Sequence, residues 1–371
     1  MAERETKRVL LVLNYMGHGG IEAVVMNYYR FLDRKLIQFD FAVCEDSPIP
    51  QKREILALGG RIFLLPSLMH QRQYQHRIRE LIRREGYEIV HCHMNTLSVF
   101  PLYGAWRAKV KVRICHNHTT AHKGEGMRTL AKYLLRPFCR LFATDYFACG
   151  AYAARWMYGR KALKNGEVYL LQNAVDEERF RYRMIARLSI RKKLDLSDKF
   201  VVGHIGRFTY QKNHEFLIDI FREVYRKNPR AVLLLVGEGE LEEAIRRKVK
   251  RLGLEEAVIF YGTCQDTSVL YQAMDVFCLP SFYEGLPVVA VEAQMNGLPL
   301  ILSEHVTKEA VLLESCKRLS LKEKASVWAD EVLHADKDEK RRQEAWKQVE
   351  KQGFSIEKAA GELLEYYFYY F

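Results

Sequence analysis

The sequence has few of the features that build membrane-spanning or disulfide-linked proteins. Its N-terminal apolar run, residues 9–13, is shorter than the roughly 7–15 apolar residues of a signal peptide or the about 20 of a membrane span. Its eight cysteines form no CxxC pair, and we interpret them as small buried hydrophobes in a reducing compartment rather than as zinc ligands. We therefore expect a cytoplasmic protein whose membrane contact is peripheral.

The composition is that of an ordinary globular protein with more than one domain. At roughly 150 residues per domain, 371 residues predict two domains. Apolar residues make up 49% and charged residues 28%, which excludes a disordered chain, a collagen and a coiled-coil rod. The formal net charge is +12, and residues 1–181, with 29 basic and 17 acidic side chains, carry all of it. A basic half favours an anionic partner: nucleic acid, a membrane surface or a phosphorylated substrate.

Short apolar runs alternate with helical patterns along most of the chain. Strands are expected near residues 9–14, 39–45, 61–66, 88–93, 110–118, 145–150 and 168–176, and, after a polar stretch, near 199–207, 231–239, 258–263, 275–281 and 299–304. This alternation predicts an α/β protein of two doubly wound, Rossmann-like parallel-sheet domains facing a cleft, with ligands at the strand ends. We place the domains at 1–180 and 181–352, and expect the aromatic helix 353–371 to dock back on the first.

Two cations follow the first strand of the second half. Arg207 comes directly after Gly206, where a strand ends, and Lys212 lies where the next helix begins. The planar Arg fork, the Lys ammonium and a helix N-terminus together suit a diphosphate. Two solvated loop charges are the alternative interpretation.

Two carboxylates lie near the start of a later helix. Glu284 is expected in the loop before that helix and Glu292 in its second turn. Carboxylates accept hydrogen bonds from ribose or sugar hydroxyls. A solvated helix face is the alternative for Glu292, but its neighbours are apolar, and a carboxylate in an apolar stripe needs a partner or a ligand.

Glycines and histidines follow the strands of the first half. The loop 17–20, Gly-His-Gly-Gly, allows close backbone approach to a phosphate or simply makes a tight turn, and the full GxGxxG pattern is absent. Four histidines end two consecutive strands, and a spacing of two puts the rings of each pair on one side: His91, His93, His116 and His118. No carboxylate cluster accompanies them, so we favour one His as a hydrogen-bond partner of a sugar over a metal site. Structural histidines are the alternative for the first pair.

A basic helical pattern lies around residues 126–142. Four cations recur every four residues beside leucines and a phenylalanine: Arg128, Lys132, Arg136 and Arg140. This pattern is typical of an interfacial helix on anionic lipid, although a core helix with a solvated basic edge is an alternative. Pro137 is expected to kink or split the helix. No finger, RNP or basic-zipper pattern is present, so nucleic acid is not an expected partner.

Arg207 with Lys212, followed by Glu284-x7-Glu292 within PSFYEGLPVVAVEAQMNGLP, resembles the signature of family 4 retaining glycosyltransferases of the GT-B fold. The resemblance runs over about residues 9–320 and includes GGIE, VHCH, RICHNH, QNAVD, VGEGE and MDVFCLPS. The chain is most similar to members that build bacterial exopolysaccharide and capsule. The resemblance implies retaining transfer of a hexose or N-acetylhexosamine from a nucleotide-diphosphate sugar, with UDP as the first choice of nucleotide, to a lipid-linked glycan acceptor at the inner face of the cell membrane. Another GT-B enzyme, such as a nucleotide-sugar epimerase, or a non-catalytic nucleotide-sugar or lipid binder is the alternative.

The resemblance also implies roles for individual residues. Arg207 and Lys212 bind the donor diphosphate, Glu292 binds the donor ribose, and Glu284 lies by the donor sugar as a catalytic residue. Further donor contacts are Gly19, Gly20, Gly237, Gly285 and Leu286. His116, taken as the first residue after its strand, sits at the reacting centre, with His118 as the competing candidate. No Asp-x-Asp occurs, so donor binding without a metal or other cofactor is expected, with front-face attack by the acceptor hydroxyl.

Overall fold

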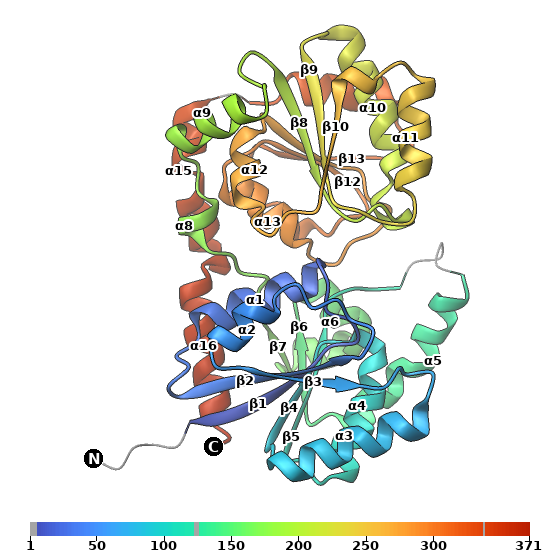
Figure 1. The fold of residues 1–371 in the computed structure, drawn as a ribbon, viewed down its shortest axis with the longest axis vertical. Helices are drawn as coiled ribbons and strands as arrows, with labels where there is room; N and C mark the ends of the chain where they lie inside the picture. Colours follow the sequence, from blue (N-terminus) through green and yellow to red (C-terminus); the bar gives the residue numbers. More distant parts are fainter. Residues whose placement is uncertain (1–5, 122–125, 337) are drawn as a thin grey trace. The chain divides into compact units, whose positions relative to one another are not determined.

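The computed structural model describes residues 6–121, 126–336 and 338–371. The chain divides into two compact units (Figure 1): unit 1 is Met1–Gln172 with Ile356–Phe371, and unit 2 is Asn173–Ser355. The division therefore falls at Gln172/Asn173 and not at the expected 180/181. Asn173 and Val175 already belong to unit 2, because the Asn173 amide donates to the carbonyl of Leu286 and Val175 forms a parallel β-bridge with Ser355.

Unit 1 is built on a seven-stranded parallel sheet in the order β3-β2-β1-β4-β5-β6-β7. The strands are β1 (Lys7–Val12), β2 (Ile37–Cys44), β3 (Arg61–Leu65), β4 (Ile89–Cys92), β5 (Val112–Asn117), β6 (Asp145–Ala148) and β7 (Val168–Leu170). The helices are α1 (Gly20–Phe31), α2 (Lys52–Ala57), α3 (Gln71–Glu85), α4 (Val99–Arg107), α5 (Met127–Phe142), α6 (Ala151–Tyr158), α7 (Arg160–Lys164) and the C-terminal α16 (Ile356–Phe368), with a 3₁₀ turn η1 (Asn95–Ser98).

Unit 2 is built on a six-stranded parallel sheet in the order β10-β9-β8-β11-β12-β13. Its strands are β8 (Phe200–Ile205), β9 (Ala231–Val236), β10 (Val258–Gly262), β11 (Val276–Leu279), β12 (Leu300–Ser303) and β13 (Cys316–Leu319). The helices are α8 (Glu177–Phe180), α9 (Met184–Lys193), α10 (His214–Lys227), α11 (Glu242–Arg251), α12 (Ser268–Ala273), α13 (Val288–Met295), α14 (Ala325–Leu333) and α15 (Glu339–Val349). Short turns are η3 (Tyr210–Lys212), η4 (Glu255–Ala257), η5 (Lys308–Ala310) and a π-helical turn η6 (Glu350–Phe354).

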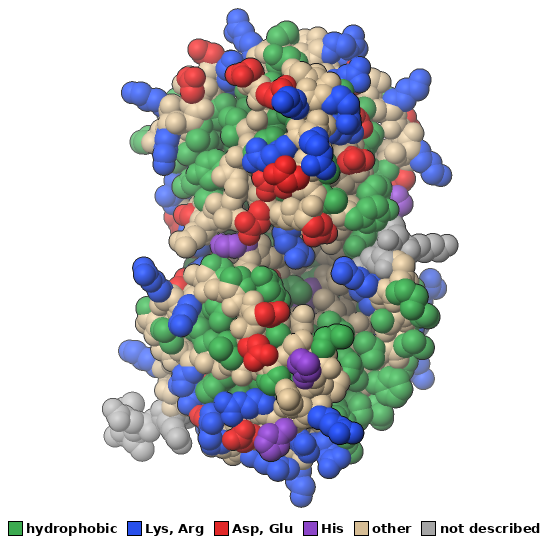
Figure 2. Space-filling model, turned by 45° about the vertical axis from the view of Figure 1, so that its right-hand side comes forward, with side chains coloured by type: hydrophobic (Ala, Val, Ile, Leu, Met, Phe, Trp, Pro, Cys, Tyr) green, Lys and Arg blue, Asp and Glu red, His purple; other side chains and the backbone are tan. Residues whose placement is uncertain are grey.

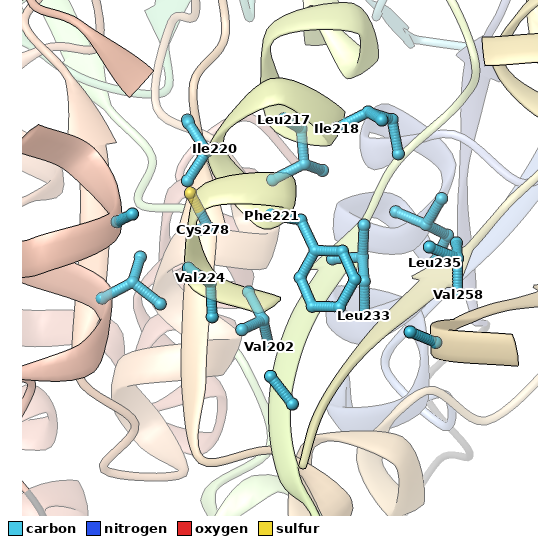
Figure 3. Close-up of a cluster of buried hydrophobic side chains, with 14 of the residues drawn as sticks. Val202, Leu217, Ile218, Ile220, Phe221, Val224, Leu233, Leu235, Val258 and Cys278 are labelled. Carbon is cyan, nitrogen blue, oxygen red and sulfur yellow. The ribbon is translucent and has the colours of Figure 1, made fainter. Parts of the chain in front are cut away.

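The apolar runs of the sequence become central strands because helices cover both faces of each sheet (Figure 1). In unit 2, the helix spacing of Leu217, Phe221 and Val224 turns one face of α10 toward Val202 of β8 and Leu233 of β9, and all five side chains are buried (Figure 3). Burying one side chain of this size contributes about 1.5–3 kcal/mol. These cores fix the strand ends on which the polar loops stand.

Each sheet has one point where the strand order reverses, which is where ligands bind in doubly wound folds. In unit 1 it lies between β1 and β4, so the glycine loop after β1 and His93 after β4 stand at neighbouring strand ends. In unit 2 it lies between β8 and β11, so Gly206 and Arg207 after β8 stand beside the loop that follows β11. Of the site residues predicted from sequence, Gly19, Arg207 and Glu284 lie in these loops. Glu292 lies on α13, His116 in β5 and Gly237 after β9.

Candidate active site

The two cations of the second unit differ in their surroundings. Arg207 is exposed directly after β8 and forms no ion pair within the described part of the chain. The Lys212 ammonium, at the end of η3, donates to Glu284 Oε1 at 2.7 Å, and both side chains are largely buried. The Gln211 amide donates to the other carboxylate oxygen at 3.0 Å. Lys212 is therefore fixed by a carboxylate, while Arg207 is open to a ligand.

Two glycines let the backbone turns of this site approach each other. A Cβ on Gly237 would lie 2.3 Å from the carbonyl oxygen of Gly206, and Gly237 has a φ of +135°. Only glycine fits a position that combines this φ with this contact. Gly237 thus holds the turn after β9 against the turn after β8, beside Arg207.

Glu292 is buried in the second turn of α13, as the sequence predicts. The side chain is 6% exposed, and the hydroxyl of Tyr271, from α12, donates to its Oε2 at 2.7 Å. Burial raises the pKa of Glu292 to about 7, and the Tyr271 hydrogen bond and the nearby Arg179 only partly oppose this shift. Burying an ionisable carboxylate costs folding free energy, so its presence here points to a ligand that donates hydrogen bonds to it.

The loop between β11 and α13 is held by a hydrogen bond from Asn173, which is distant in sequence. Gly285 and Leu286 are buried in this loop, before the N-cap Pro287 of α13. The Asn173 side chain donates to the carbonyl of Leu286 at 2.6 Å. Its own Oδ1 is buried without a hydrogen-bond partner among the described residues. Asn173 therefore fixes the conformation of the segment that carries Glu284.

The glycine loop of unit 1 encloses a carboxylate. Gly19 is the N-cap of α1 and Gly20 its first residue. A Cβ on Gly19 would lie 2.4 Å from Glu22 Oε2, and the backbone N–H of Gly17 donates to Glu22 Oε1 at 3.3 Å. The Glu22 carboxylate thus fills part of the space that the loop would offer to an anion. It also accepts one of the backbone N–H groups that would otherwise bind that anion.

The four histidines form one buried, stacked group. Ring centroids are 4.2 Å apart for His91 and His93 and 4.0 Å apart for His116 and His118, as the spacing of two predicts. Across the strands, His91 Nε2 lies 3.1 Å from His116 Nδ1, and His93 Nδ1 lies 3.1 Å from His118 Nε2. His116 Nε2 and His118 Nδ1 are buried without partners among the described residues.

One premise about these histidines is wrong. His116 was expected as the first residue after its strand, but β5 continues to Asn117 because its pairing with β6 extends to Asn117 and Ala148. His118 is the first residue after the strand and is 8% exposed, whereas His116 is 0% exposed. Burial lowers the pKa of both imidazoles, that of His118 to about 3, so both rings are neutral near pH 7.

The histidine group also has the composition of a metal site. Ligand atoms of His91, His93 and His116 lie within 4.8 Å of one another. Ring planes of stacked neighbours are inclined by only 21–23°, and an imidazole lone pair lies in its ring plane. His91 thus stacks nearly parallel on both other rings, while the planes of His93 and His116 are inclined by 43°. Because the lone pair of His91 lies in a plane nearly parallel to those of its neighbours, the three lone pairs do not converge on one ion, and the rings would have to turn to hold a metal.

Helix α5 presents an exposed apolar stripe beside its cations, most of which also contact unit 1. Three cations turn to backbone carbonyls of unit 1: Lys132 donates to Thr120, Arg136 to Trp156 and Arg140 to Tyr158. Arg128 and Arg140 are nevertheless exposed, and the exposed large hydrophobic side chains beside them are Met127, Leu130, Tyr133, Leu134, Phe138 and Leu141. Figure 2 shows hydrophobic side chains gathered with Lys and Arg on the side of unit 1 where Figure 1 places α5. Helix α5 is continuous through Pro137, and no helix of the described residues has the length and apolarity to span a bilayer.

Sequence reasoning missed the residues that hold the predicted ones in place. Tyr271, Gln211 and Asn173 bind Glu292, Glu284 and Leu286 respectively, and each lies in a different loop or helix from its partner. Only Asn173 carried a sequence signal, as part of the QNAVD segment. The other two are ordinary polar residues whose function depends on tertiary contact.

Two family models match the chain. Residues 18–179 match the model described as Glycosyltransferase Family 4, and residues 186–352 match Glycosyl transferases group 1. EpsF of Bacillus subtilis (strain 168), which is named as a glycosyltransferase, is 36% identical over 370 residues, 97% of this chain and 96% of EpsF. This chain belongs to the family 4 glycosyltransferases.

Other relatives of this glycosyltransferase agree with that assignment. An Escherichia coli UDP-Gal:alpha-D-GlcNAc-diphosphoundecaprenol alpha-1,3-galactosyltransferase is 25% identical over 301 residues, 76% of each chain. The crystal structure of HepE from Anabaena, in complex with UDP and glucose, superposes with a TM-score of 0.81 over 96% of this chain and 98% of HepE, at 17% identity. The expected GT-B fold of two doubly wound sheets is confirmed, and the glycosyltransferase interpretation is favoured over an epimerase or a non-catalytic binder.

Proposed function

We propose that this glycosyltransferase moves a hexose or N-acetylhexosamine from a UDP-sugar to a lipid-linked glycan, with retention, in exopolysaccharide or capsule biosynthesis. The observation that carries the donor side is the arrangement in unit 2, where an exposed arginine, a buried Lys–Glu pair and a buried carboxylate stand around one sheet switch point. The UDP and glucose bound to HepE and the diphosphoundecaprenol in the name of the E. coli relative support the choice of substrates.

The proposed donor site divides the nucleotide sugar among its residues. Arg207 supplies a planar fork to the diphosphate, and Lys212 adds a point charge. The Lys212 ammonium has three N–H donors and uses one on Glu284, so it retains donors for a phosphate oxygen. Gly237, Gly285 and Leu286 line the neighbouring turns, and the ionised Glu292 accepts from ribose hydroxyls.

Charge development sets what these groups do during transfer. As the anomeric C–O bond breaks, negative charge grows on the leaving diphosphate, and Arg207 with Lys212 stabilises it electrostatically. Glu284, held by Lys212 and Gln211, lies by the donor sugar and stabilises the cationic anomeric carbon. The acceptor hydroxyl attacks from the face of the leaving phosphate, which takes up its proton. The described residues of the site hold no pair of adjacent free carboxylates for a divalent ion, and we propose metal-independent transfer.

In unit 1, we propose His116 as the group at the reacting centre and Gly19 and Gly20 as donor contacts. The unpartnered Nε2 of His116 supports this choice, since a buried polar atom needs a partner. His118 has the same kind of orphaned nitrogen and the strand-end position. Separate His116→Gln and His118→Gln variants decide between them, because only the residue that contacts substrate lowers kcat/KM by more than about tenfold.

We further propose that α5 binds an anionic membrane surface where the lipid-linked acceptor lies. The exposed apolar stripe would enter the lipid interface, and Arg128, Lys132, Arg136 and Arg140, which lie together on one side of the helix beside that stripe, would attract the headgroups. The net charge of +12 favours an anionic surface. We accordingly propose that the protein acts at the inner face of the cell membrane.

Transfer assays with a panel of nucleotide sugars test the proposed function. Wild-type protein is incubated with each donor and with extracted lipid-linked glycans, and the anomeric configuration of the product is read by NMR. We expect transfer from a UDP-sugar with retention, and its loss in Arg207→Ala. Transfer with inversion, or equal activity of Arg207→Ala, would contradict the proposal.

A further inference from the structure

The C-terminal helix joins the histidine group through one hydroxyl. Tyr367 Oη of α16 lies 2.6 Å from His91 Nδ1, and His91 Nε2 lies 3.1 Å from His116 Nδ1. All three side chains are fully or almost fully buried. His116 Nε2, at the far end, has no hydrogen-bond partner among the described residues. A single row of hydrogen bonds thus leads from α16 to an unoccupied ring nitrogen.

The chemistry of a neutral imidazole fixes the direction of this row. Each neutral ring carries one N–H and one lone pair. Among the described residues, Tyr367 Oη has only His91 Nδ1 within hydrogen-bond distance, so its buried O–H must donate there or remain unsatisfied. His91 Nδ1 then carries the lone pair and His91 Nε2 the proton. His91 therefore donates to His116 Nδ1, which leaves the proton of His116 on Nε2.

The opposite direction is disfavoured by the count of unsatisfied groups. If His91 Nδ1 donated to Tyr367, the tyrosine O–H would be left buried without an acceptor, and His116 Nε2 would be a second orphan. In the direction derived above, only the N–H at His116 Nε2 lacks a partner. A second row, from His93 to His118, contains no hydroxyl and so has no group that selects its direction.

We propose that Tyr367 is a positioning residue that sets the tautomers of His91 and His116, so that His116 presents a hydrogen-bond donor, and not an acceptor, at Nε2. This inference rests on the proposed role of His116 at the reacting centre for its consequence, but not for its geometry. A donor at this nitrogen recognises an oxygen with a lone pair, which is the chemistry of a sugar hydroxyl or a phosphate. It would not serve as a general base.

The test compares three forms of the full chain labelled with ¹⁵N-histidine: wild type, Tyr367→Phe and Tyr366→Phe. Ring nitrogens of His91 and His116 are assigned from the signals lost in His91→Gln and His116→Gln. Tyr366→Phe is the matched control, because it removes a hydroxyl from the same helix without touching the histidines. The Tyr366 hydroxyl donates to Asp145 at 2.5 Å, and Tyr370 still donates to that carboxylate in the variant. Activity is measured as kcat and KM for the donor sugar.

In wild type and Tyr366→Phe we expect one tautomer, with the proton on Nε2 of both rings. In Tyr367→Phe the two directions have equal numbers of unsatisfied groups, so we expect a mixture near equal parts and at least a twofold fall in kcat with little change in KM. A proton on Nδ1 of His116 in wild type, or an unchanged tautomer in Tyr367→Phe, overturns the proposal. Mixed tautomers with full kcat overturn its link to the reaction, whereas absence of transfer by wild type contradicts the proposed function instead.

Discussion

Replacing Glu292 by Gln separates the destabilisation caused by a buried carboxylate from its proposed role in binding the donor ribose. Burial raises the pKa of Glu292 to about 7, from 4.5 in an unperturbed glutamate, while the Tyr271 hydroxyl donates to it. Above pH 7 the unliganded protein therefore holds a carboxylate charge inside an apolar helix face. A glutamine of nearly the same shape still accepts from Tyr271 through its carbonyl oxygen but does not ionise.

The sign and size of the effect follow from linkage. The folded-state pKa of Glu292 is above the unfolded value, so its contribution to stability is fully present below about pH 4.5 and is lost as pH rises through 7. At 1.36 kcal/mol per unit, a shift of roughly 2.5 units corresponds to about 3 kcal/mol. We expect Glu292→Gln to have nearly the wild-type free energy of unfolding at pH 4.5 and to exceed it by up to about 3 kcal/mol at pH 8.

Glu292→Gln should be the more stable protein at high pH, but wild type should bind the donor more tightly there. Ribose hydroxyls that donate to Glu292 favour its ionised form, so the affinity of wild type for UDP should rise as pH increases from 6 to 8. The phosphate of UDP also titrates, with a second pKa near about 6, but this contribution is common to both proteins. The difference between wild type and Glu292→Gln therefore isolates Glu292, and we expect it to grow with pH in favour of wild type.

The measurements are chemical denaturation and UDP calorimetry across pH 4.5 to 8. Glu243→Gln is the matched control, since Glu243 is exposed on α11 of the same unit and should change neither quantity. A Glu292→Gln protein less stable than wild type at pH 8 would refute the burial argument. A UDP affinity whose pH dependence is the same in both proteins would refute the assignment of Glu292 to the ribose.

Three further predictions concern the phosphate contacts, metal dependence and the membrane surface. Arg207→Ala should lose about 2–4 kcal/mol of transition-state stabilisation in kcat/KM with an unchanged melting temperature, because Arg207 is exposed; Lys212→Ala should in addition destabilise unit 2, since it leaves Glu284 buried without its cation, and equal melting temperatures would contradict that pairing. Excess EDTA should leave transfer intact, and activity abolished by chelator and restored by Mg²⁺ or Mn²⁺ would contradict metal-independent transfer. Leu130→Ser with Leu134→Ser should weaken sedimentation with anionic vesicles at low salt while hydrolysis of soluble donor stays unchanged, and Leu56→Ser, exposed on α2, is the control; undiminished sedimentation would contradict docking through α5.

Much of the fold followed from the sequence because it depends on local periodicity. The apolar runs near residues 9–14 and 231–239 became β1 and β9, and Glu292 lies in the second turn of its helix, α13, as expected. The strand β13 was not expected, because Cys316–Leu319 is short and half of it is charged, as suits the edge of a sheet. The compact units divide at Gln172/Asn173, before the expected 180/181, because tertiary contacts that have no periodic signal join Asn173 to unit 2.

The sequence predicted which residues belong to the candidate site but not their contacts, because tertiary contacts leave no periodic signal. Spacing along the chain placed Glu292 on α13 and Lys212 before α10, but it gave no information about what each side chain touches. The sequence predicted Lys212 as a diphosphate ligand but gave no sign of its ion pair with Glu284. The expected strand over residues 110–118 already included His116, and the pairing of β5 with β6 through Asn117 shows that this range, and not the placement of His116 after the strand, was correct.

Helix α5 shows why composition predicts a surface better than it predicts the face that is used. The four cations of α5 lie close together around the helix, and three of them reach carbonyls at 2.8–3.2 Å. Because these cations turn one side of α5 toward unit 1, another side of the helix, which carries leucines and Phe138, is exposed. The same residues that suggest attraction to anionic lipid are thus the ones that orient the apolar stripe. Charge reversal of all four would remove these contacts, so a loss of membrane binding in such a variant would not separate electrostatic attraction from a displaced helix. Substitution of the outward leucines leaves the carbonyl contacts in place and therefore tests the surface itself.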